Sequence, residues 1–381
     1  MEVRPRIRIA IHAAGARRGA GAGFNRVLTM AKEFPELCPW DDFLFAVRPE
    51  LTVDVRAAAP GAAIASPLRG LPASLRVLWE QIVLPFELGR WEPDVVFGAL
   101  NLLPLWVAGK RPAYVLMVTN LLPFSDERRT LSGRARLTQE VVRWLTLMSI
   151  RRADTVLLLS PRARDLIGSR ALRDKARVLP PAVPKARSGP GPARAAGEHT
   201  FVVAADLWPH KSIETVVRAL ALAAIPGARV KIFGRSSNEG YVRALRAEIR
   251  RLGVEESVSL EGWVERAALL AEMAAAEACI APARFENLSH VLAEAFAAGA
   301  PLLAADIPGS QEICGDAALF FPPGDELALA KLMCRIVGER DLRKELIGNG
   351  SERYRAMAAH DQSAVILDAI AESVNGPGRR G

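Results

Sequence analysis

The stretch Ala281-Pro-Ala-Arg-Phe-Glu286-Asn-Leu-Ser-His-Val-Leu-Ala-Glu294-Ala-Phe-Ala-Ala-Gly299-Ala-Pro301 decides the fold that we expect for this chain. An apolar strand ends at its start, a polar loop leads into a helix of small residues, and a second apolar strand, 302–304, follows. Such a βαβ unit binds ligands at the carboxyl ends of its strands. Glu286 leaves the strand beside the free N–H groups of the helix, which suit a phosphate. Glu294 follows about two helical turns later, where the hydroxyls of a bound ligand would satisfy its carboxylate.

The surroundings of these two glutamates match a known family as well as their spacing does. Pro282 precedes the loop, Gly299-Ala-Pro301 ends the helix, and Ile307-Pro-Gly-Ser-Gln-Glu312 follows downstream. Together they resemble the signature of the retaining GT-B glycosyltransferases of glycosyltransferase family 4, also called glycosyl transferases group 1. The resemblance implies two Rossmann-like, doubly wound α/β domains that face a central cleft, and a C-terminal helix that crosses back to the first domain. An isolated pair of glutamates at this spacing is more simply a solvated helix face.

Alternating strands and helices predict a parallel, doubly wound sheet in each half of the chain. Residues 185–198 are rich in Pro, Gly, Ala and charge, which indicates a linker. We therefore expect an acceptor-binding domain over 1–184, a nucleotide-sugar-binding domain over 199–350, and a crossover helix and tail over 351–381, helical across 351–374. The clearest strands are expected at 6–13, 94–98, 113–119, 155–160, 200–204, 229–234, 258–260 and 279–281.

Composition is that of a folded protein of two domains, with 381 residues, half of them hydrophobic and a quarter charged. The four cysteines are scattered without metal-ligand spacing, so they are typical of free thiols in a reducing compartment. No uncharged apolar run approaches the roughly 20 residues that span a bilayer. The start of the chain lacks the apolar core of a signal peptide. We expect a cytoplasmic protein that contacts the inner face of the membrane peripherally.

A net charge of +8 needs an explanation, and much of the excess lies between Arg128 and Arg164. Apolar residues recur there at helical spacing beside the arginines. One explanation is an ordinary Arg-rich surface. Another is a patch for anionic lipid headgroups, where each cation contributes about 1 kcal/mol. Nucleic-acid binding ranks last and is not expected, because the chain has few aromatic residues and no reader motif.

Lys211 is the main cation of the expected donor site, since it lies between a strand and a helix in the segment 207–213. Cleavage of a nucleotide sugar leaves a diphosphate, and a cation beside helix N–H groups stabilises that charge without metal. The resemblance places Lys211 on the diphosphate, Glu286 on hydroxyls of the donor sugar and Glu294 on the ribose hydroxyls. It also implies donor contacts from the start of the helix and from turns lining the cleft: Asn287, Leu288, Ser289, His290, Gly234, Arg235, Gly262 and Val264.

The first half carries weaker signals. A glycine run after the first strand suggests dinucleotide binding, but its G-x-G-x-G spacing departs from the G-x-G-x-x-G that a dehydrogenase needs. In the family that the chain resembles, an equivalent loop closes over the donor phosphates, which implies that role for Gly21 and Gly23. Asn101, Asn120 and Glu80 are the candidates on the acceptor side.

Two positions depart from the family pattern. Many relatives have an arginine shortly before the lysine, where this chain has Asp206, and an aspartate cannot neutralise phosphate. Arg284 or Arg235 is then the candidate replacement cation. Many relatives also place His-Asp where Thr119 and Asn120 stand here, which argues against a side-chain general base. In the same-face mechanism widely assigned to this family, the leaving phosphate itself helps to deprotonate the acceptor.

The sequence thus predicts a retaining glycosyltransferase that uses a nucleotide-diphosphate sugar as co-substrate, with no cofactor and no metal ion. Its acceptor is a hydroxyl of a glycan or of a glycolipid precursor. Two alternatives stay open. One is a catalytically silent GT-B scaffold that binds a nucleotide sugar or a partner enzyme, and the other is a nucleotide-sugar epimerase of the same fold. An epimerase converts the donor without an acceptor, and a scaffold keeps its function when Glu286 or Lys211 is replaced.

Overall fold

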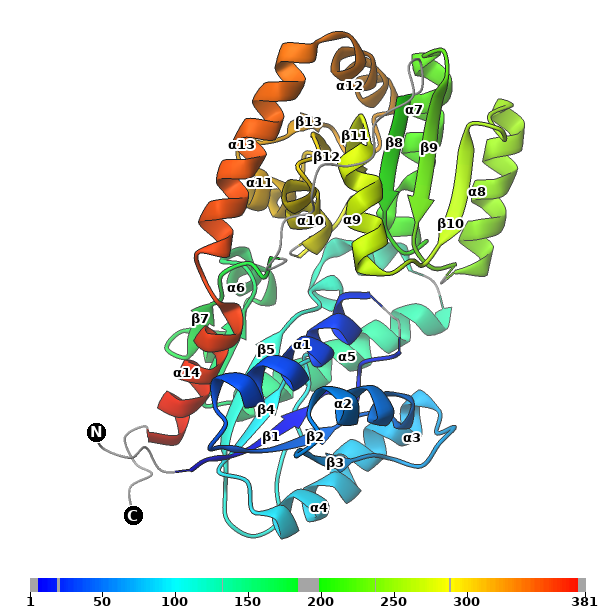
Figure 1. Ribbon diagram of the computed structural model, residues 1–381. Coiled ribbons are helices and arrows are strands. Elements are labelled where there is room, and N and C mark those ends of the chain that lie inside the picture. Colours follow the sequence, from blue (N-terminus) through cyan, green and yellow to red (C-terminus); the bar gives the residue numbers. More distant parts are fainter. Residues whose placement is uncertain are drawn as a thin grey trace. The chain divides into compact units, whose positions relative to one another are not determined.

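The computed structural model describes residues 6–18, 21–131, 133–183, 199–236, 238–287 and 289–375. The chain divides into two compact units (Figure 1). Unit 1 comprises Met1–Pro180 and Asp361–Gly381, and unit 2 comprises Pro181–His360. The expected linker, 185–198, lies outside the described residues.

Unit 1 is built on a parallel sheet, in which the described residues form seven strands in the order β3-β2-β1-β4-β5-β6-β7. The central strand β1 pairs with β2 on one side and with β4 on the other, so that Ile9 lies between Phe43 and Val95. All three of these side chains are buried, as expected for a strand with helices on both faces of the sheet. The strands are Arg8–His12 (β1), Asp42–Ala46 (β2), Ala63–Ala65 (β3), Val95–Gly98 (β4), Ala113–Val118 (β5), Thr155–Leu158 (β6) and Ala176–Val178 (β7).

The helices of unit 1 include one from the end of the chain, α14, which packs on α1, β4, β5 and β6. Two side-chain hydrogen bonds join α14 to the rest of the unit. The Ser363 hydroxyl donates to Glu33 (2.5 Å), and the Ser373 and Thr155 hydroxyls lie 2.8 Å apart. The helices are Gly21–Leu37 (α1), Thr52–Ala58 (α2), Ala73–Leu78 (α3), Leu84–Trp91 (α4), Gly133–Arg152 (α5), Arg162–Ile167 (α6) and Gln362–Asn375 (α14), with a π-helical turn at Trp79–Val83.

Unit 2 repeats the architecture, and its described residues form six parallel strands in the order β10-β9-β8-β11-β12-β13. Its core combines strand residues such as Phe201, Ile280 and Leu303 with apolar residues of the covering helices. The strands are His199–Ala204 (β8), Ala228–Phe233 (β9), Val258–Gly262 (β10), Ala278–Ala281 (β11), Leu302–Ala305 (β12) and Leu319–Phe321 (β13). The helices are Ile213–Ala223 (α7), Glu239–Leu252 (α8), Arg266–Ala275 (α9), His290–Ala298 (α10), Pro308–Cys314 (α11), Glu326–Gly338 (α12) and Arg340–Ala358 (α13), with a 3₁₀ turn at Pro209–Lys211 (η6).

The structure confirms the α/β class and every strand expected above, and it adds β2, β3, β7 and β13. The single helix expected over 351–374 is wrong, because α13 ends at Ala358 and α14 begins at Gln362. The carboxylate of Asp361 accepts a hydrogen bond from the Ser363 N–H (2.9 Å), and such a side-chain cap starts a new helix.

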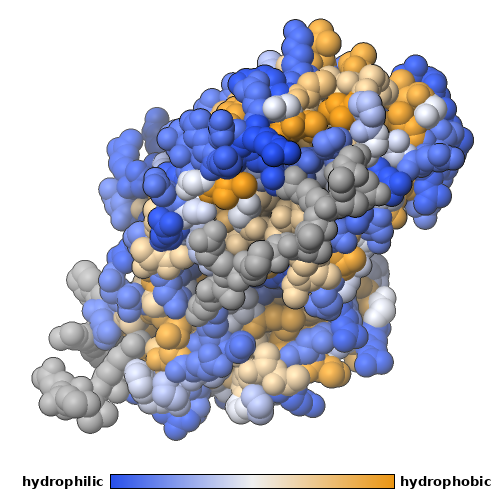
Figure 2. Space-filling model, turned by 45° about the horizontal axis from the view of Figure 1, so that its top comes forward, coloured by the Kyte–Doolittle hydropathy of each residue, from blue (hydrophilic) through white to orange (hydrophobic). Residues whose placement is uncertain are grey.

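Figure 2 shows one face of the molecule, where apolar areas lie scattered among hydrophilic ones. Among the described residues, no helix is long and apolar enough to cross a membrane. No disulfide joins the four cysteines, all of which are described: Cys38, Cys279 and Cys314 are buried, and Cys334 is exposed.

Candidate functional site

A pocket in unit 2 lies where the neighbouring strands β8 and β11 end. The carboxyl ends of parallel strands meet at one edge of a sheet, which is why residues far apart in sequence converge there. The lining includes both strand ends, the turn after β8, the loop after β11 and the first turn of α10. Its residues include Ala204, Lys211, Ala281, Glu286, Ser289 and Ser310.

Lys211 and Glu286 form an ion pair in this pocket. Lys211 ends the turn η6, and Ser212 then adopts a left-handed conformation with φ of 52° before α7 begins. Both paired side chains are only 20% exposed, so solvent screens their interaction less than it screens a surface pair. The sequence singled out both residues as donor-site candidates, and in the structure they neutralise each other.

The turn that carries Lys211 is bound to the loop that carries Glu286 by a backbone hydrogen bond. Arg284 N–H donates to the carbonyl oxygen of His210 over 2.9 Å. Burial first, and the neighbouring Lys211 second, lower the pKa of His210 to about 4. His210 is therefore neutral at pH 7, and Lys211 supplies the positive charge of this turn.

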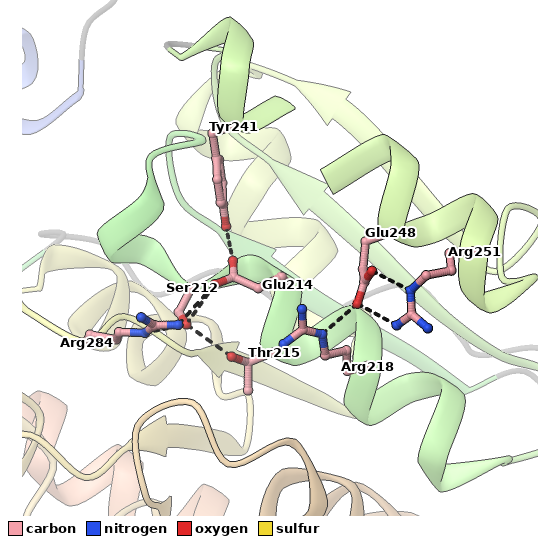
Figure 3. A network of polar contacts seen from close by, with 8 residues as sticks. All are labelled: Ser212, Glu214, Thr215, Arg218, Tyr241, Glu248, Arg251 and Arg284. Atoms are coloured by element: carbon pink, nitrogen blue, oxygen red, sulfur yellow. Dashed lines mark hydrogen bonds and ion pairs between the residues drawn. The ribbon is translucent and has the colours of Figure 1, made fainter. Parts of the chain in front are cut away.

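The Arg284 side chain reinforces this link (Figure 3). Its Nε donates to the Ser212 hydroxyl (3.0 Å) and its Nη2 to Glu214 (3.2 Å). Tyr241 donates its hydroxyl proton to the same carboxylate and accepts from Ile213 N–H (2.8 Å). Burial raises the pKa of Tyr241, which keeps it a proton donor. Arg284, one of two candidate replacement cations for phosphate, is thus engaged in neutralising Glu214 and positioning the Lys211 turn.

A second group of charges in Figure 3 lies further along α7 and α8. Glu248 accepts from Arg218 (2.6 Å) and from Arg251 (2.8 Å), and these hydrogen bonds lower the pKa of Glu248 to about 2. None of these three residues lines the pocket. They join the two helices at the surface, where an ion pair contributes at most about 1 kcal/mol.

The loop after β11 is also held from the side of α11. A Cβ on Gly309 would lie 2.7 Å from the carbonyl oxygen of Glu286 and 3.2 Å from that of Asn287. Only glycine allows this approach, and it brings the next residue, Ser310, into the pocket lining. This contact gives a physical reason for the Ile-Pro-Gly segment noted in the sequence.

Glu294 lies in the second turn of α10 and is 8% exposed. Arg266, the first residue of α9, places Nη2 3.1 Å from its carboxylate. Burial raises the pKa of Glu294, and Arg266 partly opposes that change. Arg266 was not singled out in the sequence, since nothing local distinguishes it from other surface arginines. His290 begins α10 without lining the pocket, and Leu288 lies outside the described residues.

The turns after β9 and β10 are joined to each other and to the turn after β8. Gly234 N–H donates to the Gly262 carbonyl (2.8 Å), and a Cβ on Gly234 would lie 1.9 Å from the Ala205 carbonyl oxygen. Asp206, the unusual residue, accepts from the backbone N–H of Arg235 (2.9 Å). The Arg235 guanidinium lies 5.5 Å from the centre of the Trp263 ring, just before Val264. Asp206 therefore orders the turns at this edge of the sheet.

In unit 1, Asn101 organises the end of β5. It has a positive φ of 62° and is 5% exposed. Its Oδ1 accepts from Thr119 N–H (2.9 Å), from the Thr119 hydroxyl (3.0 Å) and from Asn120 N–H (2.8 Å), while its Nδ2 donates to the Asn120 carbonyl (2.8 Å). Asn101 thus shapes the segment that replaces the His-Asp pair of many relatives.

The other candidates of unit 1 are Gly21 and Gly23, at the start of α1, and Glu80, beside the last residue of β1. Gly21 and Gly23 form the first turn of α1. Glu80 is fully buried and accepts from Arg76 (2.5 Å). Its second carboxylate oxygen lies 3.6 Å from Nε2 of His12. The position of Glu80 suits holding Arg76 in place, since a fully enclosed carboxylate does not reach a substrate.

Comparisons with known proteins find similarity to glycosyltransferases. Residues 190–353 match the model of the family described as glycosyl transferases group 1. The exopolysaccharide phosphotransferase of Streptomyces coelicolor is 34% identical over 188 residues, which cover 47% of this chain and 19% of that protein. The matched parts of the curated relatives span between 19% and 65% of their own lengths.

Solved structures resemble almost the whole chain. Sucrose-phosphate synthase from Thermosynechococcus elongatus is 18% identical, with a TM-score of 0.78 over 97% of this chain and 99% of its own. Anabaena HepE in complex with UDP-glucose is 17% identical, with a TM-score of 0.73 over 97% of this chain and 100% of its own. At this identity the likeness shows the fold. The chain therefore has the GT-B fold, and its residues 190–353 are similar to the glycosyl transferases group 1 family.

Proposed function

We propose that this protein is a retaining glycosyltransferase that moves a sugar from a nucleotide-diphosphate donor to a hydroxyl of a glycan or lipid-linked glycan precursor. One observation carries the proposal: Lys211 and Glu286 meet in a pocket at the strand ends of unit 2, beside the first turn of α10. A cation, a carboxylate and a helix N-terminus in one pocket suit a diphosphate joined to a polyhydroxylated sugar. HepE, which has the same fold, binds UDP-glucose.

Lys211 stabilises the leaving diphosphate in this proposal. Negative charge builds on the diphosphate as the glycosidic bond breaks, and a fixed cation in a partly enclosed site stabilises the transition state more than the ground state. No metal ion is then needed for that charge. Glu286, released from its ion pair, accepts hydrogen bonds from hydroxyls of the donor sugar.

The nucleoside part of the donor lies toward Glu294 and Val264. Glu294 is buried and offers its second oxygen to ribose hydroxyls while Arg266 holds the first. The loop from Gly262 to Val264 supplies backbone groups for the base, and the hydrogen bond from Gly234 N–H to the Gly262 carbonyl holds the start of this loop. Retention of the anomeric configuration follows from the same-face mechanism, in which the diphosphate itself accepts the acceptor proton.

A thermal-shift screen with UDP, GDP, ADP, TDP and CMP-linked sugars tests the donor site. A ligand that binds only the folded state at a hundredfold excess over its Kd adds about 2.7 kcal/mol of stability. The shift should vanish in Lys211→Ala and persist in Lys231→Ala, a matched control whose own glutamate partner, Glu272, lies 2.9 Å away outside the pocket. No shift with any nucleotide in the wild type would refute the proposal.

Turnover separates the proposal from its alternatives. A glycosyltransferase consumes the donor faster when its acceptor is present and loses turnover in Glu286→Ala. Conversion of the donor sugar into an epimer without any acceptor would identify an epimerase. Nucleotide binding with no turnover, and a cellular function that survives Glu286→Ala, would identify a scaffold.

The proposal includes a cytoplasmic location and peripheral contact with the anionic inner face of the membrane. On α5, Leu137, Val141 and Trp144 are exposed at helical spacing, and Arg136 lies beside them. An exposed apolar stripe flanked by cations is typical of an interfacial helix. Co-sedimentation with phosphatidylglycerol vesicles should fall in Trp144→Ser, and equal binding to neutral phosphatidylcholine vesicles would contradict an electrostatic contact.

A further inference from the structure

Two guanidinium groups lie against the loop between β1 and α1 in unit 1. Nε of Arg48, in the loop after β2, donates to the Ala14 carbonyl over 3.2 Å. Nη1 of Arg76, on α3, is 3.9 Å from the place where a Cβ on Gly15 would be. A third cation, Arg17, follows in the same loop and is exposed. Two arginines therefore lie against this loop, and a third belongs to it.

This cluster holds more positive than negative charge. The Arg48 and Arg76 side chains are 16% and 14% exposed, so solvent screens them weakly. Arg76 is paired with Glu80, which also faces His12 at 3.6 Å. Among the described residues, the acidic partner of Arg48 is Glu50, at 3.6 Å and 43% exposed. Arg17 forms no ion pair within the described residues.

The arginines repel one another. Burial first, then the charges of Arg76 and Arg17, lower the pKa of Arg48, and Glu50 and Glu80 oppose this only in part. Nε of Arg76 is buried and has no hydrogen-bond partner among the described residues. This enclosed atom does not reach a ligand, but an anion beside the guanidinium groups would relieve their mutual repulsion.

The first turn of α1 lies close by. Cβ positions built on Gly15 and on Gly23 both fall 3.7 Å from side-chain carbons of Leu100, so the helix start and the loop share one neighbour. The N-terminus of this helix of 17 residues carries partial positive charge. It adds to the attraction of the three arginines for an anion.

We propose that Arg17, Arg48 and Arg76 form a phosphate subsite in unit 1, and that the phosphate belongs to the acceptor substrate. Guanidinium groups bind phosphate oxygens in bidentate fashion, which suits a cluster of arginines. The donor diphosphate already has Lys211 in unit 2. The acceptor is then a phosphate-bearing sugar or lipid. Naming the acceptor rests on the proposed function, whereas the anion subsite itself does not.

Inorganic phosphate is the first probe, titrated against the melting temperature at constant ionic strength. We expect stabilisation of the wild type and of Lys211→Ala, and at least roughly tenfold weaker phosphate binding in Arg48→Gln, as for one lost charge-assisted hydrogen bond. Arg17→Ala tests the same subsite through an exposed residue whose loss does not threaten folding. Arg111→Ala, an exposed arginine 3.5 Å from Asp154, is the matched control and should behave as the wild type.

Nucleoside diphosphates are the second probe and separate the two sources of phosphate. If nucleotide affinity is unchanged in Arg48→Gln and lost in Lys211→Ala, the phosphate bound in unit 1 belongs to the acceptor. If nucleotide affinity falls in both variants, the subsite binds the donor, and its assignment to the acceptor phosphate is overturned. The proposed subsite would be refuted if phosphate did not raise the melting temperature of the wild type. It would also be refuted if the rise were undiminished in both Arg48→Gln and Arg17→Ala. Phosphate binding without any nucleotide binding would leave the subsite standing and remove the proposed transfer function.

Discussion

Replacing Asn101 should release the segment at the end of β5, because its side chain makes four of the hydrogen bonds that shape this segment. In Asn101→Ala, the backbone N–H groups of Thr119 and Asn120 both lose their acceptor. Thr119 is half-buried and Asn120 exposed, so water replaces part of each bond, and we assign about 1 kcal/mol to each. Alanine at a φ of 62° adds about 1 kcal/mol of backbone strain. The expected loss is about 3 kcal/mol.

Asn101→Gly separates the two contributions, since glycine adopts positive φ without strain. It should lose only the side-chain hydrogen bonds, about 2 kcal/mol. A chain of two units need not unfold in one step, so local amide hydrogen exchange is the better assay. At 1.4 kcal/mol per factor of ten, exchange at Thr119 and Asn120 should accelerate about 30-fold in Asn101→Gly and about 100-fold in Asn101→Ala.

The amide of Cys279 provides an internal control, because it donates to Pro301 in unit 2 (2.8 Å) and should keep its protection. Exchange at Thr119 and Asn120 that stays within about threefold of the wild type in Asn101→Gly would refute the reasoning, since threefold is only about 0.7 kcal/mol. It would mean that packing, and not Asn101, holds the segment. If exchange accelerates equally in the glycine and alanine variants, only the assigned backbone strain is refuted, and the role of the hydrogen bonds stands.

Three further changes test unit 2. Gly234→Ala should destabilise the unit by about 3 kcal/mol or more, because its Cβ would lie 1.9 Å from the Ala205 carbonyl oxygen; a melt like that of the wild type would contradict this. Burial raises the folded-state pKa of Glu294, so stability is greatest below the unfolded pKa and falls as pH rises through the folded pKa. Arg266→Ala raises that pKa further, and its melting temperature should fall further below the wild type at pH 8 than at pH 5; equal deficits would disprove the pairing. Arg284→Met should weaken nucleotide binding roughly tenfold by freeing the Lys211 turn, and unchanged affinity would leave Arg284 with a structural role only.

The sheets and the strand ends that carry the candidate site could be predicted from the sequence, because the signals for them are local. The alternation of apolar strands with helices predicted two doubly wound sheets, and the structure has them. The glutamate spacing after β11 and the lysine before α7 pointed to the same edge of one sheet. Lys211 and Glu286 are 75 positions apart, yet their meeting followed from the rule that parallel strands end together.

The pairing of side chains that are far apart in the sequence could not be predicted. Arg284 was a candidate for phosphate, but Ser212 and Glu214 occupy it. Arg266 gave no signal, although it is the partner of Glu294. Three-residue edge strands and the break between α13 and α14 were missed, since so few residues give no period and a single capping aspartate outweighs a continuous helical pattern.

The sequence by itself therefore determined the fold class, the strand ends that carry the candidate donor site and the residue types in it. The tertiary structure alone decided which charges are free and which are neutralised. Asp206 orders a backbone turn, Glu80 is enclosed with Arg76, and Arg48 lies near the like charges of Arg76 and Arg17 from two other segments. The physical reason is that hydrophobic period and turn chemistry act over a few residues, whereas electrostatic energies depend on distances and burial that exist only after folding.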